Sequence, residues 1–438
     1  MFYSMFSSLL ISSAIVTADV CAKPVGRVIP IARSFRQRPP VHPYSLPIFD
    51  PDSVKRELRG LWPKYRKAPM YLSGIELGSG VDQFLDEIVA AEDEANQPFI
   101  PPVLISDHSM PLKDYISGNL DLMYFGPVNF GTPAQKLTVD IDTGSSDLWI
   151  PVNCPECVNK QFEDTKSSTC KNSDENFSVY YGSGEVSGTL TQDVVSIAGL
   201  EVRDQFFGAV SQVSDDFNGL PNDGLLGLAF GAISQSGKPT FFETLIKRDM
   251  LPAPMFSIHL SRNQESGSDV CFGCLDTFKT LGPVEWIPVL NKTYWCVSLD
   301  AVVVNSKPVR TDLTGIIDSG TTLIYLPASY ADEVYAMIPG AKPAPQFGPE
   351  FYTYPCSTAP NVAFSFDGRR FSISPLDFNL GLAAPNSSDC VGGVLSLGSD
   401  GFPPNLAIIG DVFLKSWYTT FDYSGGARVG FSPSINNR

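Results

Sequence analysis

Apolar and polar positions change in short runs along most of the chain, from about residue 109 to its end. The apolar runs are alternating or continuous, and Gly, Pro, Asn and Asp break them about every 8 to 12 residues. This pattern predicts a mostly β protein. A hairpin with a glycine-rich tip is expected at about residues 177–190. Two helices interrupt the strands, one opening with a capping box at Thr240 and Glu243 and another expected to open at Ser329 and Asp332.

One stretch of this pattern occurs twice. Val139–Ser146 places an aspartate after an apolar strand and follows it with a small hydroxyl residue and a glycine, and Gly315–Thr322 does the same 176 residues later. Each aspartate is followed nine positions on by a proline, Pro151 or Pro327. A second motif, two apolar residues followed by a glycine, also occurs in both halves. Its glycine is Gly227, 85 residues after the first aspartate, and Gly410, 92 residues after the second. The chain is therefore predicted to contain two related halves.

The duplication has a chemical consequence. Two halves packed about an approximate two-fold axis bring equivalent residues together, so Asp142 and Asp318 are expected to face each other. Repulsion between two carboxylates in one site raises the pKa of one and leaves the other low, so the pair shares one proton in acid. The ionised carboxylate can take a proton from water while the protonated one donates to a carbonyl oxygen. This chemistry requires no metal, cofactor or nucleophilic side chain.

The duplicated motifs resemble those of the pepsin-like aspartic proteases, over about residues 109 to 433. The resemblance extends to Asn129–Gln135 and to Tyr180–Gly184, which is similar to the flap of that family. It implies the bilobal pepsin-like acid-protease fold, with two related β-barrel-like lobes and an active-site cleft between them. It also implies an aspartic-type endopeptidase, whose extended polypeptide substrate would bind as an added strand. We expect an N-terminal lobe at residues 103–286 and a C-terminal lobe at residues 287–438.

The resemblance assigns roles to individual residues. Asp142 and Asp318 would form the catalytic dyad. The residue directly after each aspartate would brace the two loops across the axis, and the hydroxyl residue after each glycine would bind the outer carboxylate oxygen. Tyr181 would close over the substrate with its hydroxyl toward Trp149. The implied support residues are Thr143, Gly144, Ser145, Ser319, Gly320 and Thr321. The implied flap and substrate-binding residues are Trp149, Tyr181, Gly182 and Ser183.

The first hundred or so residues differ in composition from the rest. Residues 1–22 form a short apolar run that ends in small residues, which predicts a secretion signal peptide despite the lack of an early Lys or Arg. Residues 23–67 hold 11 Lys and Arg against 3 Asp and Glu, whereas residues 103–438 hold 20 against 36. A basic arm ahead of an acidic body predicts intramolecular docking. The alternative, a disordered or nucleic-acid-binding tail, does not suit a secreted acidic protein.

The resemblance implies a propeptide at residues 23–102, with its inhibitory part at about residues 23–67. Lys64 and Tyr65 resemble the pair that blocks the dyad in some zymogens. An ammonium group between two carboxylates keeps both ionised, and protonation of the carboxylates in acid breaks the pairing. The acidic stretch at about residues 76–95 has apolar residues at helical spacing and predicts a helix. Cleavage of the propeptide is expected between about residues 98 and 112.

Nine cysteines occur, of which Cys21 lies in or beside the signal peptide. The family resemblance implies a disulfide between Cys356 and Cys390. The remaining cysteines form two triplets: Cys154, Cys157 and Cys170, and Cys271, Cys274 and Cys296. Cys154, Cys157, Cys271 and Cys274 could instead form a split four-cysteine zinc site. The expected oxidising compartment favours disulfides over this zinc site. Each triplet either keeps one free thiol or contributes its third cysteine to a longer-range pair.

The expected compartment follows from the signal peptide. The acceptor sequons at Asn176, Asn291 and Asn386 are expected to carry glycans in a secreted chain. No later apolar stretch has the length of a membrane span, so the protein is expected outside the cell or in an acidic lumen of the secretory pathway. Its expected partners are polypeptide substrates and its own propeptide, without nucleic acid or membrane, and a monomer is expected.

Two other functions are alternatives to proteolysis by the dyad. A serine hydrolase is excluded because only three histidines occur and no Gly-x-Ser-x-Gly elbow is present. A catalytically inactive pepsin-fold binding protein is the second alternative, and the intact dyad motifs and flap tyrosine argue against it.

The expected specificity is for large hydrophobic residues around the cut. Family members commonly have an aromatic residue where this chain has Asn222, which argues against a strictly aromatic pocket. Acidic residues lie nearby in the sequence, Asp215 and Asp216 upstream of Asn222 and Glu185 after the flap glycines, so a wider tolerance for basic residues near the cut is expected.

Overall fold

The computed structural model describes residues 46–73, 75, 108–118, 120–181, 184–215, 217–398 and 402–438. All of these belong to one compact unit, His42–Arg438. Several predictions lie outside the described residues: the signal peptide, most of the basic arm, the acidic helix at residues 76–95, and the flap residues Gly182 and Ser183. The propeptide and lobe boundaries therefore stay predictions.

Three sheets form the framework of the described residues. In spatial order, the 13-stranded sheet contains β11 (Glu285–Pro288), β24 (Arg428–Pro433), β23 (Trp417–Asp422), β9 (Met255–His259), β10 (Ser268–Phe272), β1 (Ser109–Ser117), β2 (Leu120–Phe130), β3 (Gln135–Asp142), β8 (Gly224–Gly227), β4 (Leu148–Pro151), β7 (Leu200–Val213), β6 (Gly184–Ile197) and β5 (Lys171–Tyr181). The 7-stranded sheet contains β18 (Arg369–Ser372), β17 (Val362–Phe366), β12 (Cys296–Val304), β13 (Lys307–Ile317), β22 (Leu406–Ile409), β14 (Ile324–Leu326) and β21 (Val394–Ser396). The 4-stranded sheet contains β15 (Lys342–Pro343), β16 (Tyr352–Pro355), β20 (Asp389–Gly392) and β19 (Asn379–Leu382).

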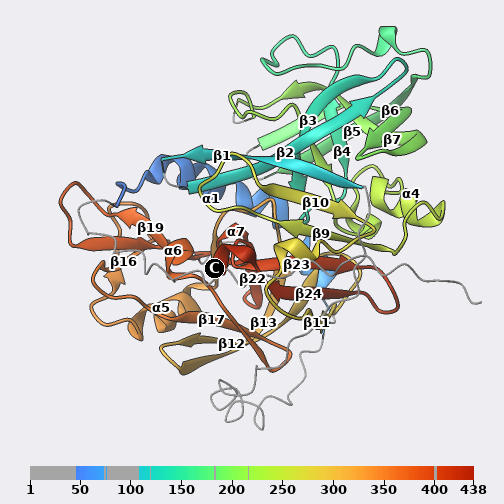
Figure 1. Ribbon diagram of the computed structural model, residues 1–438. Helices are drawn as coiled ribbons and strands as arrows, with labels where there is room; N and C mark the ends of the chain where they lie inside the picture. The colour runs from blue at the N-terminus through green and yellow to red at the C-terminus, as the bar shows by residue number, and fades with distance from the viewer. Residues whose placement is uncertain are drawn as a thin grey trace, which may run out of the picture. The chain divides into compact units, whose positions relative to one another are not determined.

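Helices are short except for the first one. The α-helices are α1 (Pro51–Tyr65), α2 (Ala68–Leu72), α4 (Phe241–Lys247), α5 (Ala328–Ala336), α6 (Pro375–Phe378) and α7 (Asp411–Leu414). The 3-10 helices are η4 (Asp164–Lys166), η5 (Gly231–Ile233), η6 (Thr277–Lys279) and η7 (Ile435–Asn437). None of the helices in the described ranges has the length and apolar composition of a membrane-spanning segment. The mostly β architecture with large sheets agrees with the predicted bilobal pepsin-like fold (Figure 1).

The two sequence halves repeat one strand arrangement. In the first half, β3 runs parallel to β8 while β4 runs antiparallel to β8. In the second half, β13 runs parallel to β22 while β14 runs antiparallel to β22. Strands β9, β10, β23 and β24, drawn from both halves, join the two (Figure 1). The sequence duplication is therefore also a structural one.

A buried aromatic cluster joins residues of the two halves. Trp295 is fully buried and packs against Phe230, Phe421 and Tyr423, with ring centroids 4.4, 5.1 and 5.0 Å away. Its indole N–H donates to the Leu228 carbonyl at 3.0 Å, so its polar atom is also satisfied. Burial of these rings joins the first half of the chain to the second.

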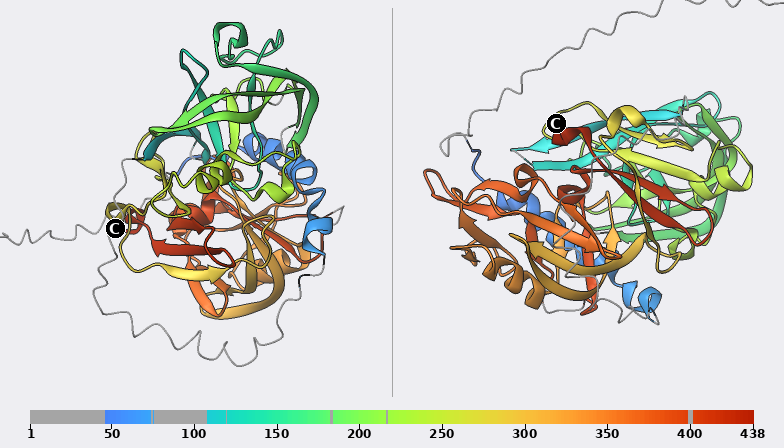
Figure 2. Two further views of the ribbon diagram at one scale, coloured as in Figure 1. Left: turned by 90° about the vertical axis from the view of Figure 1, so that its right-hand side faces the viewer. Right: turned by 60° about the horizontal axis from the view of Figure 1, so that its bottom comes forward.

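Helix α1 was not predicted from the sequence. It begins with Pro51 after the N-cap Asp50, whose side chain accepts from the Asp52 N–H at 3.1 Å. Its buried face carries Val54, Leu61 and Tyr65. Each such side chain contributes roughly 1.5–3 kcal/mol by burial, as an upper estimate. Figure 2 shows α1, drawn in blue, between the strands of the first half, in green, and those of the second, in orange.

The two later helix predictions had different outcomes. Helix α4 has the predicted capping box, with Thr240 and Glu243 bonded reciprocally. Helix α5 does not, because its N-cap is Pro327 and no side-chain cap is present. Ser329 therefore lies inside the first turn rather than before it. The prediction was wrong there because Pro327, two residues before Ser329, is the N-cap and the helix already begins at Ala328.

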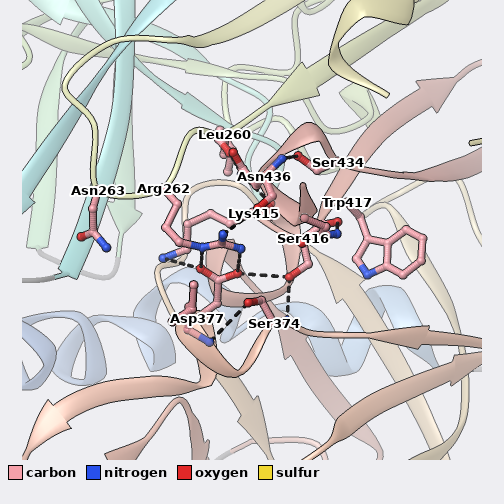
Figure 3. Close-up of polar contacts among 12 residues, drawn as sticks. Leu260, Arg262, Asn263, Ser374, Asp377, Lys415, Ser416, Trp417, Ser434 and Asn436 are labelled. Atoms are coloured by element: carbon pink, nitrogen blue, oxygen red, sulfur yellow. Dashed lines mark hydrogen bonds and ion pairs between the residues drawn. The ribbon is translucent and has the colours of Figure 1, made fainter. Parts of the chain in front are cut away.

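A buried ionic cluster connects residues of the two halves (Figure 3). Arg262, which follows β9, donates two bonds to Asp377 of α6 at 2.7 and 2.6 Å. Lys415, directly after α7, bonds Asp121 of β2 at 2.8 Å and lies 3.6 Å from Asp377. Ser416 adds a bond to Asp377 at 3.1 Å. Each buried charge thus has an opposite partner, as burial of charge requires.

Candidate active site

Two parallel strand pairs position the two aspartates. Asp142 is the last residue of β3, and Asp318 directly follows β13. The Leu228 N–H donates to the Asp142 carbonyl at 2.8 Å, and the Asp318 N–H donates to the Ile409 carbonyl at 3.0 Å. Both aspartates are almost fully buried, with exposed fractions of 1% and 0%. Equivalent strand ends from the two halves therefore bring two carboxylates into one site.

The glycine after each aspartate is required by this close approach. A Cβ atom on Gly144 would lie 2.5 Å from Oδ1 of Asp318, and a Cβ atom on Gly320 would collide with Asp142. The N–H groups of the same glycines donate to the aspartates of their own turns, at 2.8 Å to Asp142 and 2.9 Å to Asp318. Any side chain at these positions would push the two turns apart.

Hydroxyl groups connect the turns to the carboxylates and to each other. Ser145 donates to Oδ2 of Asp142 at 2.6 Å, and Thr321 donates to Oδ2 of Asp318. Across the axis, the Thr143 N–H donates to the Ser319 hydroxyl at 3.2 Å and the Ser319 N–H donates to the Thr143 hydroxyl at 2.9 Å. These two hydroxyls donate in turn to main-chain carbonyls of the opposite strand end, at 2.9 and 2.7 Å. The separation of the two turns is therefore fixed by reciprocal bonds.

The last turn of α1 inserts a lysine between the two carboxylates. The Lys64 Nζ atom lies 2.9 Å from Oδ1 of Asp142 and 2.8 Å from Oδ2 of Asp318, and its side chain is 7% exposed. The next residue, Tyr65, is buried and donates to Oδ2 of Asp318 at 2.5 Å. Arg66 lies over the ring of Tyr180, 4.0 Å from its centroid. The segment that contains α1 thus contacts the dyad and the hairpin above it.

The environment shifts the pKa values of these groups. Burial alone would raise the pKa of Asp318, but the Lys64 ammonium and hydrogen bonds, including those from Lys64 and Thr321, lower it to about 2. Burial raises the pKa of Asp142; the Lys64 charge opposes this shift, and the Asp318 charge adds to it. Burial lowers the pKa of Lys64, but the two carboxylates outweigh it and raise that pKa overall. At neutral pH the ammonium and the Asp318 carboxylate are therefore both charged.

The hairpin β5–β6 carries the predicted flap residues that the structure describes. Tyr181 is buried and packs against Trp149 and Phe217, with ring centroids 6.1 and 5.9 Å away. Within the described ranges, the Tyr181 hydroxyl and the Trp149 indole nitrogen have no hydrogen-bond partner. The two side chains are therefore neighbours by packing.

Comparisons with known proteins agree with this geometry. A family model for eukaryotic aspartyl protease matches residues 123–434. The chain belongs to the eukaryotic aspartyl protease family. It is 37% identical over 321 residues to an aspartic protease of Phaffia rhodozyma, covering 72% of this chain and 76% of the relative. It is 35% identical over 344 residues to cathepsin E-B of Xenopus laevis, covering 75% and 82%. It is 32% identical over 335 residues to pepsin A of Rhinolophus ferrumequinum, covering 74% and 83%. The protein is thus an aspartic-type endopeptidase.

The cleft of this aspartyl protease contains polar groups that sequence reasoning missed. A cavity of about 120 Å³ lies beside α1 and under the flap, and Asp140, Phe217 and Asn222 line it. Asp140 is 8% exposed, and its Oδ1 atom has no hydrogen-bond partner in the described part of the chain. Burial and the charge of Asp142 raise the pKa of Asp140. The second copy of the repeat has the buried Ile316 at the equivalent position, so a comparison of the two copies could have singled out Asp140.

The aromatic side of the cavity also differs from the prediction. Phe217, five residues before Asn222, packs edge-on against Trp149 at 5.4 Å. An aromatic wall is therefore present although position 222 is an asparagine. The Asn222 amide donates to the Gly224 carbonyl at 2.8 Å, so it acts within its own turn.

The structure decides between the two pairings that the sequence left open for the cysteine triplets. Disulfides join Cys154 to Cys157, Cys271 to Cys274, and Cys356 to Cys390. Each triplet thus keeps one free thiol, on the partly buried Cys170 and the buried Cys296. The four cysteines of the alternative zinc site are paired as disulfides.

The three sequons differ in surroundings. Asn176 and Asn386 are exposed. Asn291 is partly buried, and its amide donates to the Tyr71 carbonyl of α2 at 3.1 Å. Glycosylation at all three sites stays a prediction.

Proposed function

We propose that this protein is made as a self-inhibited, secreted zymogen that becomes an acid-active endopeptidase once the α1 segment leaves the cleft. One observation carries the proposal: a single atom, Lys64 Nζ, lies within hydrogen-bond distance of both Asp142 and Asp318. A water molecule at the position of that atom would contact both carboxylates after α1 leaves. The α1 segment would then be the inhibitory part of the propeptide at residues 23–102.

In the proposed mechanism, the dyad shares one proton over an acidic pH range. The ionised carboxylate takes a proton from the water, whose oxygen attacks the peptide carbonyl carbon. The protonated carboxyl gives its proton to the carbonyl oxygen, which forms a tetrahedral diol. The diol then collapses, the C–N bond breaks, and the amine leaves with a proton from the dyad. The bonds from Gly144, Ser145, Gly320 and Thr321 hold both carboxylates in position throughout.

The proposed substrate is an extended polypeptide under the β5–β6 hairpin. Phe217 and Tyr181 would contact large apolar side chains around the cut, in agreement with the expected preference. The Oδ1 atom of Asp140, which has no partner among the described residues, offers a buried hydrogen-bond acceptor to a basic side chain in the same cavity, which supports the expected wider tolerance. The proposed enzyme works as a monomer outside the cell or in an acidic lumen of the secretory pathway.

Replacement of each dyad residue by its amide tests the proposal. Asp142→Asn and Asp318→Asn should each lower casein or haemoglobin digestion at about pH 3 by about 10³-fold or more. A statine-type inhibitor should abolish wild-type digestion. Ser234→Ala, which removes a hydroxyl bonded to Asp147 at 2.8 Å outside the dyad, is the matched control. Undiminished digestion by either amide variant would refute the mechanism, and an inert wild-type chain after acid treatment would favour the inactive binding protein.

A further inference from the structure

Helix α1 has a solvent-facing side that the inhibition of the dyad does not use. Arg56, Arg59 and Trp62 recur there at intervals of three residues and are exposed, and Lys55 lies beside them with 41% of its side chain exposed. We call these four residues the basic face of α1. The Lys55 Nζ atom lies 4.0 Å from Asp52, whose side chain is 88% exposed, and an ion pair of this kind contributes little. The basic face therefore keeps most of its positive charge for another partner.

A hollow of about 360 Å³ lies beside the basic face. Its lining includes the apolar side chains Leu58, Phe347 and Phe402 and the charged side chains Lys55, Arg59 and Glu350. Trp62 packs edge-on against Phe402, with ring centroids 5.5 Å apart, while 40% of the tryptophan stays exposed. A surface that combines apolar and basic groups is complementary to a segment that combines apolar and acidic groups.

The chain itself contains a segment of that composition. Residues 76–95 hold seven Asp and Glu and no Lys or Arg. The apolar residues that recur there at helical spacing are Val81, Phe84, Leu85, Ile88 and Val89. Asp82 and Asp86, four residues apart, border this apolar stripe on a helix. The basic arm at residues 23–67 has the same sign of charge as the basic face, so repulsion disfavours it as the partner.

The length of the chain allows the acidic segment to reach the basic face. The described chain stops at Ile75, soon after α2, and resumes at His108. Residues 76–80 include two glycines and span up to about 17 Å when extended. The part of α1 from Lys55 to Tyr65 measures about 15 Å, so residues 81–89 can lie alongside it. A tethered segment has a high effective concentration, so contacts that are weak in isolation suffice for docking.

We propose that the acidic segment at about residues 76–95 docks on the basic face of α1, with its apolar residues in the hollow beside Leu58 and its carboxylates against Lys55 and Arg59. The segment would then stabilise α1 in the cleft from the solvent side, in addition to the bonds of Lys64 with the dyad. The consequence for latency rests on the proposed function, whereas the docking itself requires no catalysis.

Zero-length cross-linking of the full-length precursor tests the docking directly. A carbodiimide joins amines only to carboxylates that they contact, and both groups are charged at about pH 6. At low salt Lys55 should be joined to the acidic segment, chiefly at Asp82 or Asp86, in peptides identified by mass spectrometry. Lys247, an exposed lysine of α4, gives the background level. Cross-linking of Lys55 to Asp52 alone would overturn the proposal, as would links found only between light and heavy isotope-labelled molecules, which would assign the face to a second copy of the chain.

Charge reversal tests whether the contact stabilises docked α1. One variant combines Lys55→Glu with Arg59→Glu, and the other combines Asp82→Lys with Asp86→Lys. Each should raise the rate of amide hydrogen exchange in α1 by about tenfold at low salt, because attraction becomes repulsion at two pairs. The two reversals together should return the rate to within about threefold of the wild type. High salt should reduce all of these differences, because it screens surface charges.

The matched control reverses two exposed lysines outside α1, Lys247→Glu in α4 and Lys307→Glu in β13. It changes the net charge as much as the first variant does and should leave exchange in α1 unchanged. Should the reversal on α1 not fold, the reversal in the segment and the wild-type cross-links decide. Wild-type exchange rates in the segment reversal, or no recovery when the two reversals are combined, would overturn the docking.

The readouts separate this inference from the proposed function, because neither of them uses peptide cleavage. A docked segment in a chain that never cleaves substrate would overturn the proposed function alone. Acid-activated cleavage by a chain whose acidic segment is not docked would overturn the inference alone.

Discussion

Removal of the Lys64 ammonium should release the inhibited state at a higher pH. In Lys64→Met the side chain keeps much of its length but loses the two charge-assisted bonds to the dyad, at 2.9 and 2.8 Å. Bonds of this kind contribute about 1.5–3 kcal/mol each, and the cost of burying the ammonium offsets part of that sum. A net loss on the order of 3 kcal/mol weakens docking of α1 by about 10²-fold.

The pKa shifts set the pH window of this effect. The pKa of Asp318 is lowered to about 2, so the stabilisation of the docked state is fully present above a free aspartate pKa of about 4. It is lost as the pH falls through about 2. The pKa of Lys64 is raised, so its charge persists throughout the acidic and neutral range. The wild-type chain should therefore stay latent at about pH 6 and open only in acid, whereas Lys64→Met should already cleave substrate at about pH 6.

The assay uses the full-length chain purified at neutral pH. A fluorogenic peptide is added at stepwise lower pH, and the initial rate is read before the chain cleaves itself. Lys67→Met is the matched control, because the Lys67 ammonium bonds Gln235 and not the dyad, and its replacement removes the same charge from the same segment. Latency of Lys64→Met equal to that of the wild type at about pH 6, or equal activation by Lys67→Met, would refute the reasoning.

Three further predictions concern buried polar groups. Burial and the charge of Asp121 raise the pKa of Asp114 to about 9, so ionisation of Asp114 destabilises the fold as the pH rises from about 4 toward that value. Asp114→Asn should therefore raise the free energy of unfolding by on the order of 2 kcal/mol at pH 7 but not at pH 3, and equal effects in urea titrations at both pH values would contradict this. Arg262→Met should cost about 3–5 kcal/mol because it leaves Asp377 buried without its main partner, and the double variant with Asp377→Leu should recover part of that loss in the same titrations. Asp140→Leu should lower the ratio of kcat/KM for Lys over Leu peptides at the cut by about tenfold, and an unchanged ratio would remove Asp140 from the specificity argument.

Local pattern was sufficient for the parts of the site that are built from consecutive residues. The turns at Asp142 and Asp318, the β5–β6 hairpin and the capping box of α4 each depend on neighbours within a few positions. Their side-chain preferences and glycines therefore appear in the sequence directly. The duplication predicted one long-range contact, that between Asp142 and Asp318, because equivalent positions in two related halves meet at the axis.

The features that were missed depend on contacts between distant segments. Helix α1 owes its stability to the cleft that it fills, and its pattern alone, interrupted by Pro63 and rich in charge, did not predict a buried helix. Phe217 became part of the cavity through a loop whose path no local rule sets. The inhibitory role of Lys64 was implied by family resemblance, whereas its distance to both carboxylates follows from the docking of the whole helix.

The reciprocal bonds between Thr143 and Ser319 have a consequence for how the enzyme fails under stress. Each hydroxyl is anchored to the backbone of the opposite half, so neither carboxylate can drift away while its own half remains folded. Activity should therefore be lost on heating in the same cooperative transition in which the two halves unfold. It should not decline gradually at lower temperatures.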